Sequence, residues 1–89
     1  VVKRLVGHGV GYQVHEDPEI PNFGQPKTGI QLKTGMVLAL EPMVVEAGSD
    51  IILDEDSWTW KTKDGLLSAH FEHTVVVAKN GAEILTKIQ

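Results

Sequence analysis

The 89-residue sequence contains no cysteine and no long apolar run. The absence of cysteine excludes disulfides, thiolate nucleophiles and thiolate-bound zinc, so any metal site must use nitrogen and oxygen donors. A membrane-spanning helix needs about 20 apolar residues, and the N-terminus also lacks the charged-then-apolar order of a signal peptide. We therefore expect a cytoplasmic protein that makes no contact with membranes.

Basic residues are few and scattered. The net charge is -4, and no more than two of the eight Lys and Arg residues are adjacent. Phosphate backbones are recognised by clustered positive charge, so nucleic acid is not an expected partner. With 42% hydrophobic and 22% charged residues, the composition is that of an ordinary globular protein.

The chain is short for a self-sufficient core, because small domains bury a smaller share of their surface. It begins at Val1 inside an apolar run, with no initiator methionine and no helix-capping residue before it. We expect residues 1–89 to be one segment of a larger domain, truncated on its N-terminal side. Residues 1–6 are expected to end a helix and lead into a strand.

Short apolar runs between turn signals predict strands through most of the chain. The run Met36–Glu41 favours a strand that is buried on both faces. Further strands are expected at 44–45, 51–53, 58–62 and 69–78 and, after the Asn80-Gly81 turn, at 82–85. We expect residues 17–35 to form a long irregular loop, which either forms the wall of a pocket or simply lies on the surface. The sum is a mainly antiparallel sheet without the second layer that a sheet needs.

Two histidines lie near the N-terminus. His8 stands between Gly7 and Gly9, and His15 follows after a glycine-containing turn. A single histidine is more often structural than a ligand. The glycines beside His8 nevertheless leave one face of the strand open to the close approach of another group.

Two glutamates stand within apolar surroundings. Glu41 ends an apolar strand before Pro42, and Glu72 lies inside the longest predicted strand. Ionised carboxylates are seldom buried unless they are paired or bind a metal, and two that face each other repel unless a cation lies between them. The alternative for each is a solvated carboxylate at a strand end or on a wet face. Together with His8, they form a donor set that Mn, Co, Fe or Zn ions accept.

Four segments, in this order, resemble the type I methionine aminopeptidases, and the resemblance covers essentially the whole chain. They are Gly7-His8-Gly9-Val10-Gly11, His15-Glu16-Asp17-Pro18, Gly35-Met36-Val37 leading to Glu41-Pro42-Met43, and Ser68-Ala69-His70-Phe71-Glu72-His73-Thr74. The resemblance implies an α+β pita-bread fold of which residues 1–89 form the C-terminal half. It also implies two divalent metal ions, of Co, Mn, Fe or Zn, between the halves.

By the same resemblance, His8 and Glu41 are terminal metal ligands, and Glu72 bridges the two ions. Two aspartate ligands of the family precede this segment. His15 is implied to be catalytic and to hydrogen-bond the substrate near its scissile amide, and Glu72 or a neighbour is implied to carry the proton.

The resemblance also implies a pocket for the methionine side chain, walled by Trp58 and by Val14. Val14 replaces a residue that is often aromatic in the family, and His70 stands where the family often has glutamine. The implied substrates are new proteins that begin with methionine followed by a small residue. The expected partner of the segment is the missing N-terminal half or a second copy of the chain.

Three ligands are too few to hold two ions, so we expect the isolated chain to have no useful peptidase activity. Two other functions are compatible with the same fold. A proline-specific aminopeptidase P or prolidase is disfavoured by Met43, because those enzymes usually have glycine there. A non-catalytic pita-bread binding module is disfavoured by the presence of all three candidate ligands.

Overall fold

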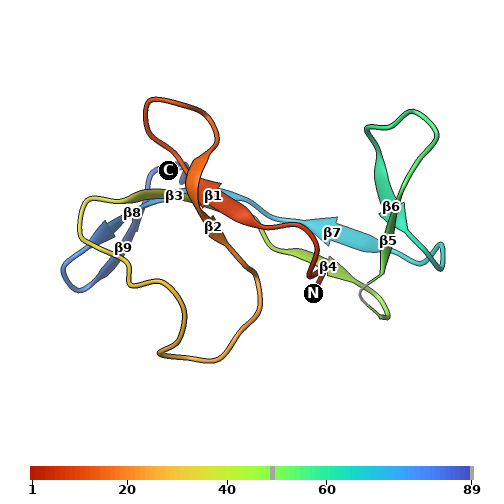
Figure 1. Ribbon diagram of the computed structural model, residues 1–89, viewed down its shortest axis with the longest axis horizontal. Helices are drawn as coiled ribbons and strands as arrows, with labels where there is room; N and C mark the ends of the chain where they lie inside the picture. The colour runs from red at the N-terminus through yellow and green to blue at the C-terminus, as the bar shows by residue number, and fades with distance from the viewer. Residues whose placement is uncertain (49, 89) are drawn as a thin grey trace.

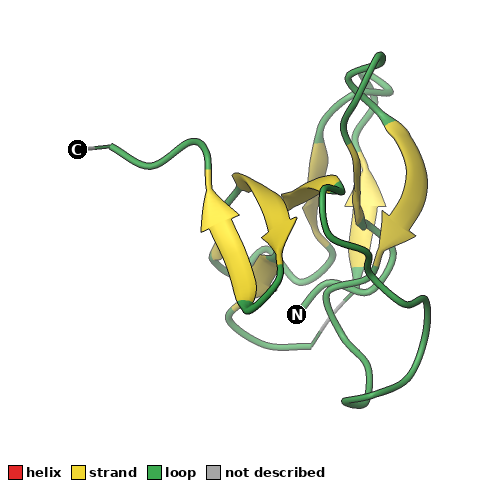
Figure 2. Cartoon of the chain, turned by 90° about the vertical axis from the view of Figure 1, so that its left-hand side faces the viewer, coloured by secondary structure: helices red, strands yellow, loops and turns green. Residues whose placement is uncertain are grey.

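The computed structural model describes residues 1–48 and 50–88. Within these ranges the chain forms nine strands and no helix (Figures 1 and 2). None of the described residues belongs to a helix that is long and apolar enough to cross a membrane. The strands are β1 (Gly7–Gly9), β2 (Glu16–Ile20), β3 (Val37–Leu40), β4 (Met43–Val45), β5 (Ile51–Leu53), β6 (Trp60–Thr62), β7 (Ser68–His70), β8 (His73–Ala78) and β9 (Gly81–Ile84).

All strand pairs are antiparallel, as predicted. Five strands form one sheet in the order β2-β1-β3-β8-β9, and β4 pairs with β7. The β5–β6 hairpin stands apart from the other strands (Figure 1). The predicted turn at Asn80-Gly81 is confirmed, because it joins β8 to β9.

β3 and β4 run side by side with β8 and β7 as one long ribbon that is interrupted in the middle. Leu40 pairs with His73 before the interruption, and Met43 pairs with His70 after it, in an unchanged register. The predicted strand 69–78 is therefore wrong in one respect, because it divides at residues 71–72. Pro42 has no N–H to donate to the ladder, although its carbonyl still accepts a hydrogen bond from the Phe71 N–H at 3.1 Å.

β1 lies between β2 and β3 and approaches both closely. A Cβ atom at Gly7 would overlap the Ala39 carbonyl oxygen of β3, and one at Gly9 would overlap the Asp17 carbonyl oxygen of β2. Any residue with a side chain at either position would push the strands apart. The two glycines therefore allow β1 to fit at this place in the sheet.

Three sequence predictions of local structure are wrong. Residues 16–20 form the edge strand β2 rather than the start of the loop, because a proline is tolerated on an edge strand at a bulge. Residues 1–6 are an irregular arm, neither helix nor strand, anchored by the buried Val2, whose N–H donates to the Met43 carbonyl at 2.8 Å. Residues 58–59 lie in the β5–β6 turn, because the Asp56 carboxylate accepts their backbone N–H groups.

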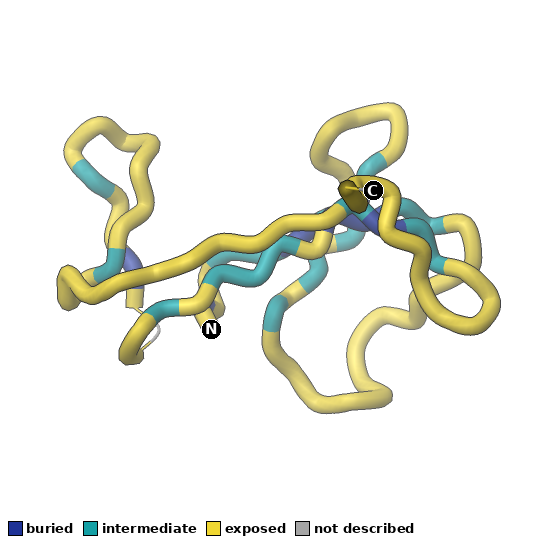
Figure 3. The backbone as a smooth tube through the Cα atoms, turned by 180° about the vertical axis from the view of Figure 1, so that it is seen from behind, coloured by how far each residue is buried: buried dark blue, intermediate teal, exposed yellow. Residues whose placement is uncertain are grey.

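The core is small and lies mainly in the central strands (Figure 3). Leu38 and Ala39 are 2% and 1% exposed, so β3 is covered on both faces as predicted. The accessible surface of the described residues is 7130 Å². A compact protein of this mass, 9.7 kDa, exposes about 5,100 Å². The excess of roughly 2,000 Å² is on the scale of an obligate interface and fits the predicted absence of a covering layer.

The β5–β6 hairpin should lose structure in acid. Hydrogen bonds from Thr59 and Trp58 lower the pKa of Asp56 below its ordinary value of 3.8, and the Glu55 N–H and Lys61 lower the pKa of Asp54. A lowered folded-state pKa gives stability that is present above pH 3.8 and is lost as the pH falls through the folded value. Amide chemical shifts of Trp58 and Thr59 should report this transition below pH 3.8.

The matched control for the acid transition is Asp56→Asn, whose amide oxygen still accepts hydrogen bonds but carries no charge. It should flatten the pH dependence of the two amide shifts. An unchanged transition in this variant would show that other carboxylates govern it.

Candidate metal centre

His8 is the middle residue of β1, and its ring makes two polar contacts. Its Nδ1 atom lies 3.0 Å from the carbonyl oxygen of Gly9, and its Nε2 atom lies 3.1 Å from Oε2 of Glu41. Because a carbonyl only accepts, Nδ1 carries a proton in the first contact. Nε2 then meets the carboxylate either with a second proton or with a shared cation. A ring whose Nδ1 donates to a backbone carbonyl is also the usual arrangement of a metal-binding histidine.

Glu41 and Glu72 occupy the interruption in the long ribbon. Since the register is the same on both sides of it, the two residues stand opposite each other on adjacent strands. The side chains of His8 and Glu41 are only 13% and 17% exposed, whereas Glu72 is exposed. Opposed carboxylates are destabilising unless a positive charge lies between them, as the sequence argument required.

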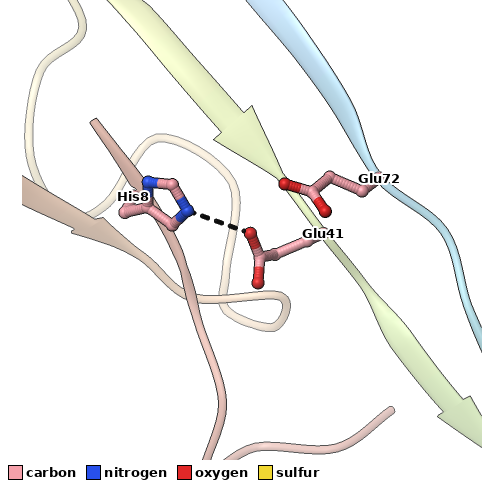
Figure 4. A group of neighbouring side chains, drawn as sticks. All are labelled: His8, Glu41 and Glu72. Carbon is pink, nitrogen blue, oxygen red and sulfur yellow. Dashed lines mark ion pairs between the residues drawn. The ribbon is translucent and has the colours of Figure 1, made fainter. Parts of the chain in front are cut away.

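The three side chains converge on one place (Figure 4). One ligand atom from each of His8, Glu41 and Glu72 lies within 4.8 Å of the other two. Two donors bound to one ion at about 2.1 Å each can be up to about 4.2 Å apart, so small side-chain movements would bring all three onto one ion. The donor set of one imidazole and two carboxylates therefore fits a divalent metal.

His15 lies beside this cluster, at the end of the loop that joins β1 to β2. Its ring centroid is 4.0 Å from that of His8, with the ring planes inclined by 41°. It is exposed, and it is not a member of the three-residue donor group. The structure thus brings together four of the six residues predicted for the site.

The pocket role of the other two predicted site residues, Trp58 and Val14, stays a prediction. They are 86% and 75% exposed, and neither lines the cavity of about 580 Å³ that opens beside Glu41. Trp60 does line it, together with Met43 and other apolar residues of the N-terminal arm, β4 and β5. Trp60 is not among the predicted site residues, although the two-residue strand period groups it with Trp58.

His70 also lines this cavity, from the end of β7. Its cross-strand partner is Met43, and both residues lie two positions from a candidate ligand. The cavity wall is apolar except for a few groups that include the Glu41 carboxylate and the His70 imidazole. Such a space, next to a candidate metal centre, suits an apolar side chain of a substrate.

The chain is similar to known proteins along its whole length. The model of metallopeptidase family M24 matches residues 1–79. The methionine aminopeptidase of Clostridium perfringens is 55% identical over 89 residues, and methionine aminopeptidase 1 of Bacillus subtilis is 53% identical. These alignments cover 100% and 99% of this chain but 36% of each relative, so the chain spans about a third of their length.

Solved structures agree with the sequence comparisons. The crystal structures of methionine aminopeptidase from Thermotoga maritima and from Rickettsia prowazekii superpose with a TM-score of 0.92 each, at 55% and 46% identity. They cover 98% and 97% of this chain, which covers 35% of each. The predicted pita-bread fold is confirmed for this segment, and the family match over residues 1–79 shows that the chain belongs to metallopeptidase family M24.

Proposed function

We propose that residues 1–89 are the C-terminal half of the catalytic domain of a type I methionine aminopeptidase that acts in the cytoplasm. The observation that carries the proposal is the convergence of His8, Glu41 and Glu72 on one place in the sheet. The relatives that match the whole chain are methionine aminopeptidases, which supports the same reaction. The large uncovered surface supports a missing half, because a sheet needs a second layer.

The complete centre would hold two divalent ions of Co, Mn, Fe or Zn. His8, Glu41 and Glu72 would hold these ions. By the resemblance, His8 and Glu41 would be terminal ligands and Glu72 would be shared between the ions. The remaining ligands, by resemblance two aspartates, would come from the missing half. When bound, such ions supply Lewis acidity that activates water and polarises a carbonyl group.

Other steps of the reaction would depend on side chains of this segment, each with a separate role. The His15 imidazole, beside the cluster, would donate a hydrogen bond to the substrate near the scissile amide and stabilise the negative charge that develops there. The Glu72 carboxylate, which is exposed at the cluster, or a neighbouring group would accept the proton of the attacking water. The apolar cavity beside Glu41 would exclude water from the bound peptide.

The substrate would be a new protein that begins with methionine. Met43 follows Pro42 where the proline-specific relatives usually have glycine, so a methionine-specific reaction is favoured over cleavage before proline. The isolated 89-residue chain would bind metal weakly and would not turn over, because it supplies only three ligand side chains.

Metal binding by the 89-residue chain should depend on the three-residue cluster. Titration with Co²⁺ or Mn²⁺, followed by calorimetry, should show that His8→Ala and Glu41→Gln each weaken affinity by more than about 100-fold, beyond what loss of a supporting group costs. Glu72→Gln should weaken it as well.

The matched control for metal binding is Glu83→Gln, which removes an exposed carboxylate on β9, outside the cluster. Its affinity should equal that of the unchanged chain. Equal losses in Glu83→Gln and Glu41→Gln would mean that the ion is held by general negative charge, and the assignment of a centre would fail.

Peptidase activity should appear only when the missing half is present. The complete enzyme should release methionine from a Met-Ala peptide, and His15→Ala should lower kcat by on the order of 100- to 1,000-fold through loss of one hydrogen-bond donor to the developing charge. The measurement is release of free methionine from matched Met-Ala and Xaa-Pro peptides.

One result would contradict the proposed reaction, and another would contradict the expected inactivity of the isolated chain. One is cleavage of the Xaa-Pro peptide in preference to Met-Ala, which would place the protein with the proline-specific relatives. The other is chelator-sensitive turnover by the 89-residue chain alone, which would show that three ligands are enough.

A further inference from the structure

The loop of residues 11–15, which carries His15, has few backbone hydrogen bonds of its own. One joins the Gly11 N–H to the Gln13 carbonyl at 3.2 Å. A second contact comes from the Glu16 side chain, whose Oε2 atom accepts a hydrogen bond from the Gln13 N–H at 3.2 Å. A carboxylate acceptor strengthens such a bond relative to a neutral one. Glu16 therefore folds back over the loop that precedes it.

The absence of a side chain at Gly11 leaves space for this carboxylate. A Cβ atom at Gly11 would overlap Oε1 of Glu16, and it would lie 2.9 Å from the Glu16 Cδ atom. The position thus has room for the carboxylate only because residue 11 has no side chain. The contact at Gly9 differs in kind, since its added Cβ would meet the backbone carbonyl of Asp17 rather than a movable side chain.

Glu16 is also fixed from its other side. It is the first residue of β2, and its Cα pairs with Gly9 of β1. His15 is thereby held between a backbone anchored in the sheet and a loop anchored by the Glu16 side chain. Its ring centroid lies 4.0 Å from that of His8.

We propose that Glu16 is a positioning residue which, seated against Gly11, fixes the loop so that the His15 imidazole stays against His8 and the metal centre. The catalytic consequence rests on the proposed function, because it requires that His15 act on the substrate. The structural consequence does not, since it concerns only the contact between the two rings and the place of the Glu16 carboxylate.

The test uses Glu16→Ala, Glu16→Gln, Gly11→Ala and the double variant with alanine at both positions. The added methyl at Gly11 should displace the flexible Glu16 carboxylate while leaving the sheet intact. The contact between the histidine rings is measured in the 89-residue chain by NMR cross-peaks between the His8 and His15 ring protons. Amide shifts of the buried Leu38 and Val75 report whether the fold is retained.

Glu16→Ala and Gly11→Ala should each remove the cross-peaks, and the double variant should behave like either single one. Glu16→Gln should retain them, because its amide oxygen still accepts from the Gln13 N–H. Gly9→Ala serves as the control, because its added methyl group would clash with backbone atoms rather than with Glu16. It should disturb the Leu38 amide shift whether residue 16 is glutamate or alanine. Retained cross-peaks in Glu16→Ala or in Gly11→Ala would overturn the proposal.

Kinetics of the complete enzyme test the catalytic part. Glu16→Ala and Gly11→Ala should each lower kcat by about 10- to 100-fold, as expected for a misplaced catalytic group. KM should change by less than about twofold in both variants. Glu16→Gln should keep the kcat of the unsubstituted enzyme. Unchanged kcat together with lost ring cross-peaks would refute the catalytic role of Glu16. If the complete enzyme without any substitution releases no methionine, the proposed function is refuted instead. The ring cross-peaks would still decide whether Glu16 positions His15.

Discussion

Two carboxylates that face each other across adjacent strands are the constraint from which the rest of the site follows. Glu41 and Glu72 stand opposite each other because the long ribbon keeps its register through the interruption at Pro42. Their mutual repulsion is relieved most simply by a cation between them. His8 completes the arrangement by pointing a ring nitrogen at Glu41, with its other nitrogen held by a backbone carbonyl. The charges at this place therefore suit a divalent cation before any comparison is made.

Close strand packing supports that arrangement. β1 is a three-residue strand that supplies only one side chain, that of His8, and the glycines on either side let its neighbours approach. The same pairing with β3 brings His8 next to Ala39, two residues before Glu41. A small sheet can thus bring distant parts of the sequence to one place without a helix in the described residues.

Much of this could be predicted from residue types, and the failures have physical causes. Patterns of hydrophobicity and turn residues predicted the buried strand β3, the turn at Asn80-Gly81 and the exposed surface. They could not predict the direct opposition of Glu41 and Glu72, because register depends on pairing between residues far apart in the sequence. β2 was missed because its proline reads as a loop signal until a bulge at a sheet edge accommodates it. Trp60 was not singled out, because the sequence does not fix where the turn capped by Asp56 ends and β6 begins.

The edge strand β2 has a consequence for how this sheet meets other chains. Three of its five residues, Glu16, Asp17 and Glu19, are acidic, and Pro18 removes a backbone donor at the bulge. Charge, proline and a bulge are the means by which proteins discourage a further strand from adding to an open edge. Growth of the sheet by strand addition is therefore discouraged at this edge, beside His8 and His15. Addition of a strand is thereby directed to the opposite edge of the five-stranded sheet, which β9 forms.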